Sequence, residues 1–169
     1  MVNYFKLFNI KEAFLINQSE LKQQFLLLSK KYHPDFFVNA TEDEKEEALQ
    51  ISAAINKGYK ILSNSVSTME YVLELNGIKE KDEKYNLPQD FLMEMMELNE
   101  QIMDAKLEQN KDVLSNCLTK IETIKDDIYK PIKTYVETYN ENLYSQEGLL
   151  QVKDYFFKLK YLERLTQNI

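Results

Sequence analysis

His33 is the single histidine of this 169-residue chain, and it lies in the sequence KKYHPDFF. An imidazole close to the carboxylate of Asp35 could serve in acid–base catalysis or in metal binding. Catalysis of this kind requires a second titrating group within reach, and a metal site requires two or three further ligands. The rigid Pro34 separates the two side chains, which therefore need not converge, and the chain offers one cysteine, Cys117, and no glycine-rich phosphate loop. We expect no catalysis, no metal and no cofactor here.

The composition excludes several other classes of function. The net charge of −7 argues against a nucleic-acid-binding protein, which would show a basic surface. No apolar run approaches the ~20 residues needed to cross a bilayer, and the first residues lack the features of a secretory signal. A lone cysteine excludes an internal disulfide. We therefore expect a cytoplasmic protein that binds neither nucleic acid nor membrane.

Two predicted helices flank the histidine. Asn17 and Glu20 have the spacing of a capping box at the start of the first helix, and Pro34 ends that helix because the residue before a proline leaves the helical region. Thr41 and Glu44 form a second capping box that starts the next helix. A loop of roughly eight residues joins two antiparallel helices of this kind. The His-Pro-Asp sequence opens the loop, where it could be a simple helix stop or a recognition site.

The rest of the chain also has helical patterns, so we predict an all-α fold. A short helix is expected at 3–8, and another helix ends at Gly77, a residue suited to the left-handed position after a helix. The charged segment 78–86 has no hydrophobic period. We predict that it is a linker between a first domain at 1–77 and a second at 87–169.

Three long amphipathic helical patterns fill the second domain. Such helices cannot bury their apolar stripes alone, so we expect an antiparallel three-helix bundle. Pro88 is expected at the first position of the first of these helices. Pro131 falls inside the second pattern and should kink or split the helix near Lys130.

Several segments occur in an order and spacing that resemble a known family. The sequence KKYHPD is followed by INKGYKIL at 55–62, as in the J-domain of DnaJ-type co-chaperones. YFKLF near the start, MEYVLELNG at 69–77, DFLMEMMELNEQI at 90–102 and LKYLERL at 159–165 extend the similarity to nearly the whole chain. They resemble the HscB family of iron–sulfur co-chaperones, of the bacterial type. The resemblance implies an N-terminal J-domain, which is an antiparallel helical hairpin with short flanking helices.

The resemblance also implies a role for the His-Pro-Asp loop. In J-domains this loop docks on an HscA/DnaK-type chaperone and accelerates its ATP hydrolysis without itself doing chemistry. A proline reduces the entropy lost on docking, an aspartate offers a charge-assisted bond, and basic residues steer the encounter. The expected chaperone-binding residues are Lys22, Lys30, Lys31, His33, Pro34 and Asp35. The lysine often found after the motif is Phe36 here, and SNSVSTM lacks the proline and basic residue usual at the start of the fourth helix.

A second candidate surface lies on the first bundle helix. A stripe of Phe91, Met95, Leu98, Ile102 and Ala105 already supplies one buried face. Leu92, Met93 and Met96 lie outside it, where they either broaden the buried face or form an exposed apolar patch of the kind that binds proteins. By resemblance, the patch binds an IscU-type iron–sulfur scaffold protein. The expected scaffold-binding residues are Leu92, Met93, Met96, Glu97, Glu100, Asp104 and Tyr161.

Together these features predict a non-enzymatic co-chaperone in iron–sulfur cluster biogenesis. It would stimulate the ATPase of an HscA/DnaK-type chaperone and deliver the IscU-type scaffold to it. The alternative is a J-domain co-chaperone that delivers a different client, and a purely structural helical protein is disfavoured by the context of the motif. The cysteine-pair zinc module of some animal and plant members is missing at the start of this sequence, so no metal is expected.

Overall fold

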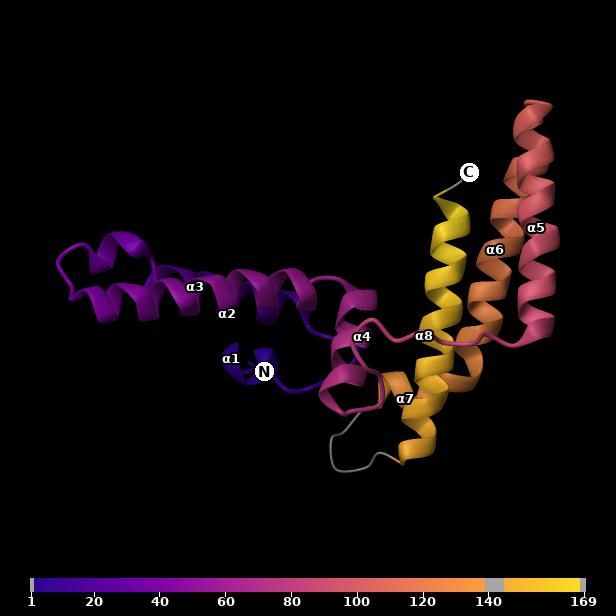
Figure 1. Cartoon of the computed structure of the whole chain (residues 1–169). Helices are drawn as coiled ribbons and strands as arrows, with labels where there is room; N and C mark the ends of the chain where they lie inside the picture. The colour runs from indigo at the N-terminus through magenta and orange to yellow at the C-terminus, as the bar shows by residue number, and fades with distance from the viewer. Residues whose placement is uncertain (1, 139–144, 168–169) are drawn as a thin grey trace. The chain divides into compact units, whose positions relative to one another are not determined.

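The computed structural model describes residues 2–138 and 145–167, and these residues form helices and connecting segments without any strand. Of the described residues 76% are helical, so the all-α prediction is confirmed. The chain divides into two compact units (Figure 1). One, here the N-terminal unit, ends at Gly77, and the other, the C-terminal unit, begins at Ile78.

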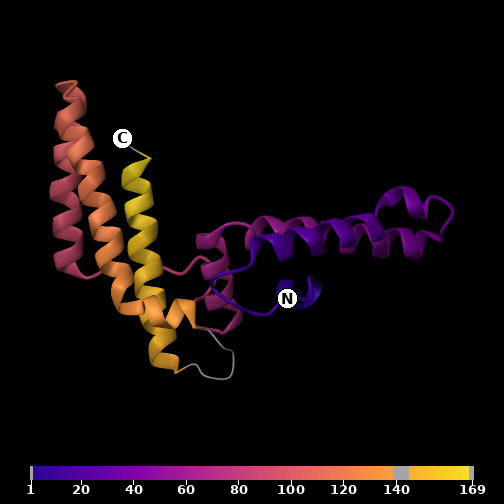
Figure 2. The same ribbon diagram turned by 180° about the vertical axis from the view of Figure 1, so that it is seen from behind.

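The N-terminal unit is a long helical hairpin with short helices packed at its base (Figures 1 and 2). Its elements are α1 (Tyr4–Leu7), α2 (Gln18–Lys31), the 3-10 turn η1 (Pro34–Phe37), α3 (Glu42–Leu62) and α4 (Ser65–Leu75). The most buried side chains are Phe5, Phe8, Phe14, Leu21, Ile55, Leu62, Val72 and Leu73. They come from every α-helix of the unit and from the segment between α1 and α2, so this core fixes the hairpin.

Side-chain caps begin both hairpin helices, and the capping box predicted for Thr41 and Glu44 is present. The Asn17 side chain accepts hydrogen bonds from the first-turn amides of α2. The capping box at the start of α3 is complete, because Glu44 Oε2 accepts from Thr41 N at 2.8 Å and Thr41 Oγ1 accepts from Glu44 N at 3.4 Å. Gly77 has a φ of +68°, the left-handed conformation expected after a helix. The capping box thus fixes the end of the α2–α3 loop at Thr41.

Close packing holds α1 against the base of the hairpin. The Tyr71 hydroxyl accepts a hydrogen bond from Tyr4 N and donates one to Val2 O, both at 3.0 Å. Gly58 of α3 faces the Tyr4 ring so closely that an added Cβ would lie 2.6 Å from Tyr4 Cδ1. A glycine is therefore needed at this position for α1 to reach α3.

The C-terminal unit is a helical bundle in which α6 packs against both α5 and α8 (Figures 1 and 2). Its elements are α5 (Gln89–Leu107), α6 (Lys111–Tyr129), the 3-10 turn η2 (Lys130–Ile132), α7 (Lys133–Glu137) and α8 (Gln146–Thr166). Pro131 lies in η2 and separates α6 from α7, as predicted. Pro88 is the N-cap of α5, one position before the place expected for it, and Gln89 is the first helical residue.

Segment 78–86 packs on α8 within the C-terminal unit. The ring of Tyr85 stacks on that of Phe157, with centroids 4.5 Å apart and an interplanar angle of 4°. Lys153 of α8 forms an ion pair with Glu83 and donates a hydrogen bond to the backbone of the segment. The segment expected to be a linker is thus held along α8 by ring stacking and by charge.

Candidate functional sites

The His-Pro-Asp sequence forms a defined turn at the tip of the hairpin. α2 ends at Lys31, and the backbone of His33 is extended, with φ −67° and ψ 132°. The His33 side chain caps η1, because its Nδ1 accepts a hydrogen bond from Asp35 N at 3.3 Å. The Phe36 amide donates to His33 O at 3.0 Å and closes the turn. Pro34 fixes the first residue of η1, so three local constraints hold the motif in one conformation.

This turn brings His33 and Asp35 together more closely than the intervening proline led us to expect. His33 Nδ1 and Asp35 Oδ2 lie 3.5 Å apart, and both side chains are exposed. Because Nδ1 accepts the amide hydrogen bond, a neutral His33 carries its proton on Nε2. The motif therefore presents an N–H donor and a carboxylate acceptor at the tip of the hairpin, an arrangement suited to recognition by another molecule.

The three predicted lysines lie at different distances from the motif. Lys30 and Lys31 occupy the last turn of α2, next to the motif, where positive charge also complements the helix C-terminus. Lys22 is more than two turns earlier. At about 100° per residue, Lys22 and Lys31 project from opposite sides of the helix. The structure brings Lys30 and Lys31, but not Lys22, to the histidine.

Exposed apolar side chains near the motif were missed by the sequence reasoning. Leu26 and Leu27 of α2 are more than half exposed, as are Phe36 and Val38 in the loop. The signal was the run FLLL at 25–28, which has more apolar residues than a single stripe of helical period can bury. The hairpin end thus carries apolar surface as well as charge.

The second candidate surface lies on α5. The predicted core stripe of this helix is buried, namely Phe91, Met95, Leu98, Ile102 and Ala105. Met93 and Met96 are 53% and 59% exposed, and Leu92 is half-buried. A broad buried face is therefore excluded for the two methionines. Apolar side chains that are exposed beside a complete core form the kind of patch at which proteins bind each other.

The remaining residues predicted for this surface come from α5 and α8. Glu97, Glu100 and Asp104 are exposed and follow Met96 along α5. Tyr161 of α8 is half-buried, with its ring edge-on to the Phe91 ring at 6.0 Å between centroids. A surface groove of about 490 Å³ contains Leu92 together with Tyr161, and it is bordered by Lys160 and Arg164. The bundle therefore places Tyr161 beside the start of the apolar patch.

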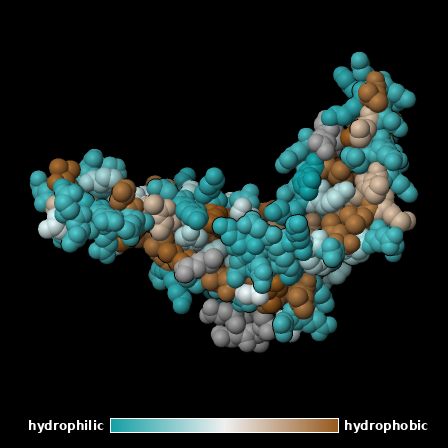
Figure 3. Space-filling view, viewed as in Figure 1, coloured by the Kyte–Doolittle hydropathy of each residue, from teal (hydrophilic) through white to brown (hydrophobic). Residues whose placement is uncertain are grey.

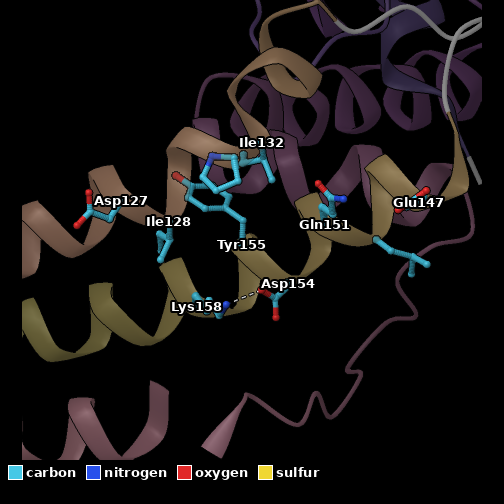
Figure 4. Close-up of a pocket in the computed structure, with 10 residues that line it drawn as sticks. Asp127, Ile128, Ile132, Glu147, Gln151, Asp154, Tyr155 and Lys158 are labelled. Carbon is cyan, nitrogen blue, oxygen red and sulfur yellow. Dashed lines mark ion pairs between the residues drawn. The ribbon is translucent and has the colours of Figure 1, made fainter. Parts of the chain in front are cut away.

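A larger groove of about 620 Å³ lies between the end of α6 and α8 and contains none of the residues predicted from the sequence (Figure 4). Tyr155 extends from α8 toward Ile132, and burial together with the neighbouring Tyr129 raises its pKa to about 12. Lys158 and Asp154 pair at 2.6 Å within α8. Two of the charged side chains at this groove, Lys158 and Asp154, thus already pair with each other.

Neither a metal-binding cluster nor a membrane-spanning helix occurs among the described residues. The part of the chain that the structure describes has no group of three or more His, Cys, Asp or Glu side chains able to hold a metal ion. Cys117 is buried in the core that α5, α6 and α8 form. None of the helices within residues 2–138 and 145–167 is long and apolar enough to cross a membrane.

Two family models and several curated proteins match this chain. The DnaJ domain family model matches residues 3–71, and the model described as HSCB C-terminal oligomerisation domain matches residues 87–169. The chain is 32% identical to the co-chaperone protein HscB homolog of Pseudoalteromonas atlantica, an alignment that covers 99% of this chain and 94% of that protein.

Solved structures show the same fold. Chaperone HscB from Vibrio cholerae matches with a TM-score of 0.76 and 30% identity, over 98% of this chain and 94% of that one. Human co-chaperone HscB matches in fold with a TM-score of 0.80 at 23% identity, over 99% of this chain and 80% of that one. The chain, with its J-domain and its helical C-terminal domain, therefore belongs to the HscB family of iron–sulfur co-chaperones.

Proposed function

We propose that this protein stimulates the ATPase of an HscA/DnaK-type chaperone and delivers an IscU-type scaffold protein to it. It is not itself an enzyme in this proposal, and it acts in the cytoplasm. The observation that carries the proposal is the exposed and internally braced His-Pro-Asp turn at the tip of the hairpin. The proposed domains are a J-domain at 1–77 and a scaffold-binding domain at 87–169, joined by 78–86.

The turn is suited to docking because little conformational freedom remains for it to lose. Pro34, the Nδ1 hydrogen bond of His33 and the capping box at the start of α3 hold it in place. Preorganisation of this kind raises affinity by reducing the entropy lost on binding. The exposed Asp35 carboxylate can accept a charge-assisted hydrogen bond from a basic residue of the chaperone.

Charge on α2 supports the same docking mode. Lys30 and Lys31 lie beside the motif, and Lys22 adds positive charge further along the helix. A local basic surface steers association toward an acidic partner and raises the association rate more than the final affinity. We infer that these lysines determine the rate of association with the chaperone, whereas His33 and Asp35 determine whether ATP hydrolysis is stimulated.

The apolar patch on α5 is proposed to hold the scaffold. Leu92, Met93 and Met96 supply flexible apolar area, and methionine adapts to a partner surface because it is unbranched and polarizable. The acids that follow, Glu97, Glu100 and Asp104, provide a polar border, and Tyr161 provides an aromatic contact at one end. This is the apolar centre with a polar rim that is usual in protein interfaces.

The chaperone arm of the proposal is tested by single-turnover ATPase assays of a DnaK-type chaperone with the full chain. His33→Gln and Asp35→Asn should abolish stimulation, and their thermal midpoints should match that of the unchanged protein, because surface changes usually alter stability by within about 0.5 kcal/mol. Asp43→Asn is the matched control, since it makes the same change at an exposed acid in the first turn of α3. Unfolding of both motif variants would instead assign a structural role to the motif.

The client arm is tested by a pull-down with purified IscU-type scaffold protein. Binding that is lost when Leu92, Met93 and Met96 are all changed to alanine would support delivery of the scaffold. Intact ATPase stimulation with no scaffold binding by the unchanged protein would favour delivery of a different client.

A further inference from the structure

Exposed apolar side chains continue along α5 well beyond the proposed scaffold-binding patch. Met103 and Leu107 are 57% and 82% exposed, in the last two turns of the helix. At about 100° per residue, Leu92, Met96, Met103 and Leu107 fall within about 60° of one another around the helix axis. They form one continuous line, here the α5 strip, beside the buried stripe and over about 22 Å of helix.

A surface groove lies at each end of the α5 strip. At its start Leu92 shares a groove with Tyr161, and at its end Met103 and Leu107 line a second groove of about 490 Å³. Asn99 lies between the two halves, and its Nδ2 donates to Met103 Sδ at 3.8 Å. Figure 3 shows hydrophobic side chains exposed among hydrophilic ones toward the far end of the bundle. The strip therefore has a groove beside each end and a polar position at its middle.

We propose that the scaffold partner contacts the full α5 strip, with Met103 and Leu107 forming a second apolar anchor about two to three turns beyond Met96. The inference rests on the proposed scaffold-binding function, because it extends the same surface along the same helix. The strip leads from the proposed patch to a second groove that is as large as the first. It therefore offers a partner more apolar surface than the patch alone. Apolar side chains seated in pockets are the contacts that carry most interface energy.

The charges beside the strip indicate the chemistry of its occupant. Glu97, Glu100 and Asp104 border the strip on the side away from the core, and α5 contains five acidic residues against one basic residue, Lys106. Two copies of the chain paired through this face would bring acidic borders together, and like charges across an interface disfavour binding. The fitting partner therefore carries an apolar ridge flanked by lysine or arginine, and a symmetric dimer through the strip is disfavoured.

The test compares full-length variants for affinity to purified IscU-type scaffold by calorimetry. Met103→Ala with Leu107→Ala should weaken binding roughly tenfold or more, because two anchors are truncated. Their melting should not change, since both side chains are exposed and alanine keeps helix propensity. Leu150→Ala is the matched control: this leucine is also exposed in the C-terminal unit but lies on α8 in the groove of Figure 4, and the change should alter affinity by less than about twofold.

The outcomes separate this inference from the function on which it rests. Unchanged affinity in the Met103 and Leu107 double variant, with affinity lost in the variant changed at Leu92, Met93 and Met96, would overturn the inference alone. Unchanged affinity in both would overturn scaffold binding by α5 altogether. Self-association in sedimentation that the double variant abolishes, without an effect on scaffold affinity, would reassign the strip to a second copy of the chain.

Discussion

Met95 and Met96 are neighbours on α5 with opposite environments, so replacing each with alanine separates core from interface. Met95 is 0% exposed and packs among α5, α6 and α8, whereas Met96 is 59% exposed. Truncation of a buried methionine to alanine costs about 2–5 kcal/mol through lost transfer energy and the cavity left behind. For a domain of this size, 1 kcal/mol lowers the melting temperature by about 4–8 °C. Met95→Ala at about 3 kcal/mol should therefore lower the midpoint of the C-terminal unit by roughly 12–24 °C.

Met96→Ala should have the opposite profile. Its melting should change by no more than a few degrees, since exposed substitutions alter stability by within about 0.5 kcal/mol. Its affinity for the scaffold should fall, because hot-spot residues at interface centres contribute about 2 kcal/mol or more. Scanning calorimetry of the full chain measures the first effect, and titration with scaffold at a temperature where Met95→Ala remains folded measures the second.

Two results would refute this reasoning. A melting temperature lowered equally by both substitutions would mean that Met96 is part of the core in solution. Scaffold affinity lost equally in a folded Met95→Ala variant and in Met96→Ala would mean that general loosening of α5, and not exposed apolar area, determines binding.

Three further predictions concern contacts inside each unit. Gly58→Ala should destabilise the N-terminal unit in thermal unfolding, because overpacking against the Tyr4 ring costs about 1–3 kcal/mol and outweighs a gain of at most about 1 kcal/mol in helix propensity. Tyr71→Phe should lower the free energy of unfolding in urea by about 1–3 kcal/mol, since it leaves the buried Tyr4 amide without its acceptor. Burial and the Asp154 carboxylate raise the pKa of Tyr85 to about 12 from 10.0, so its stabilising contribution is complete below pH 10 and is lost as pH rises to about 12. Tyr85→Phe should therefore make alkaline unfolding less steep.

Each of these predictions has a clear contrary result. A higher melting temperature for Gly58→Ala would show that the Tyr4 ring moves aside easily. Unchanged unfolding of Tyr71→Phe would show that the hydroxyl does not anchor the N-terminus. An identical alkaline transition for Tyr85→Phe would assign the pH dependence to other tyrosines with a raised pKa, among them Tyr155 and Tyr71.

The helix ends and the division at Pro131 were predictable because their causes are local. Asn17 and Thr41 satisfy amides within three residues, and Gly77 adopts the conformation that its missing side chain permits. The core stripe of α5 was predictable for a similar reason, since residues three and four apart share one side of a helix. The site residues that depend on such periodicity, Met93 and Met96, were identified as lying outside the stripe.

Other features could not be predicted because they depend on residues far apart in the chain. Segment 78–86 has no period, so its attachment to α8 through Tyr85 and Lys153 becomes visible only when residues some 70 positions apart meet. The exposure of Leu26 and Leu27 depends on how wide a face α3 covers. The same holds for Met103 and Leu107, where a neighbouring helix could have buried the end of α5.

The sequence by itself determined the family, the helices, their caps and the loop that bears His33, because all of these follow from short-range spacing and local hydrogen bonds. Only the tertiary structure decided which apolar side chains remain at the surface. Burial is a property of the neighbouring elements and not of the residue. For the same reason the structure, and not the sequence pattern, shows that the apolar strip of α5 continues to Leu107.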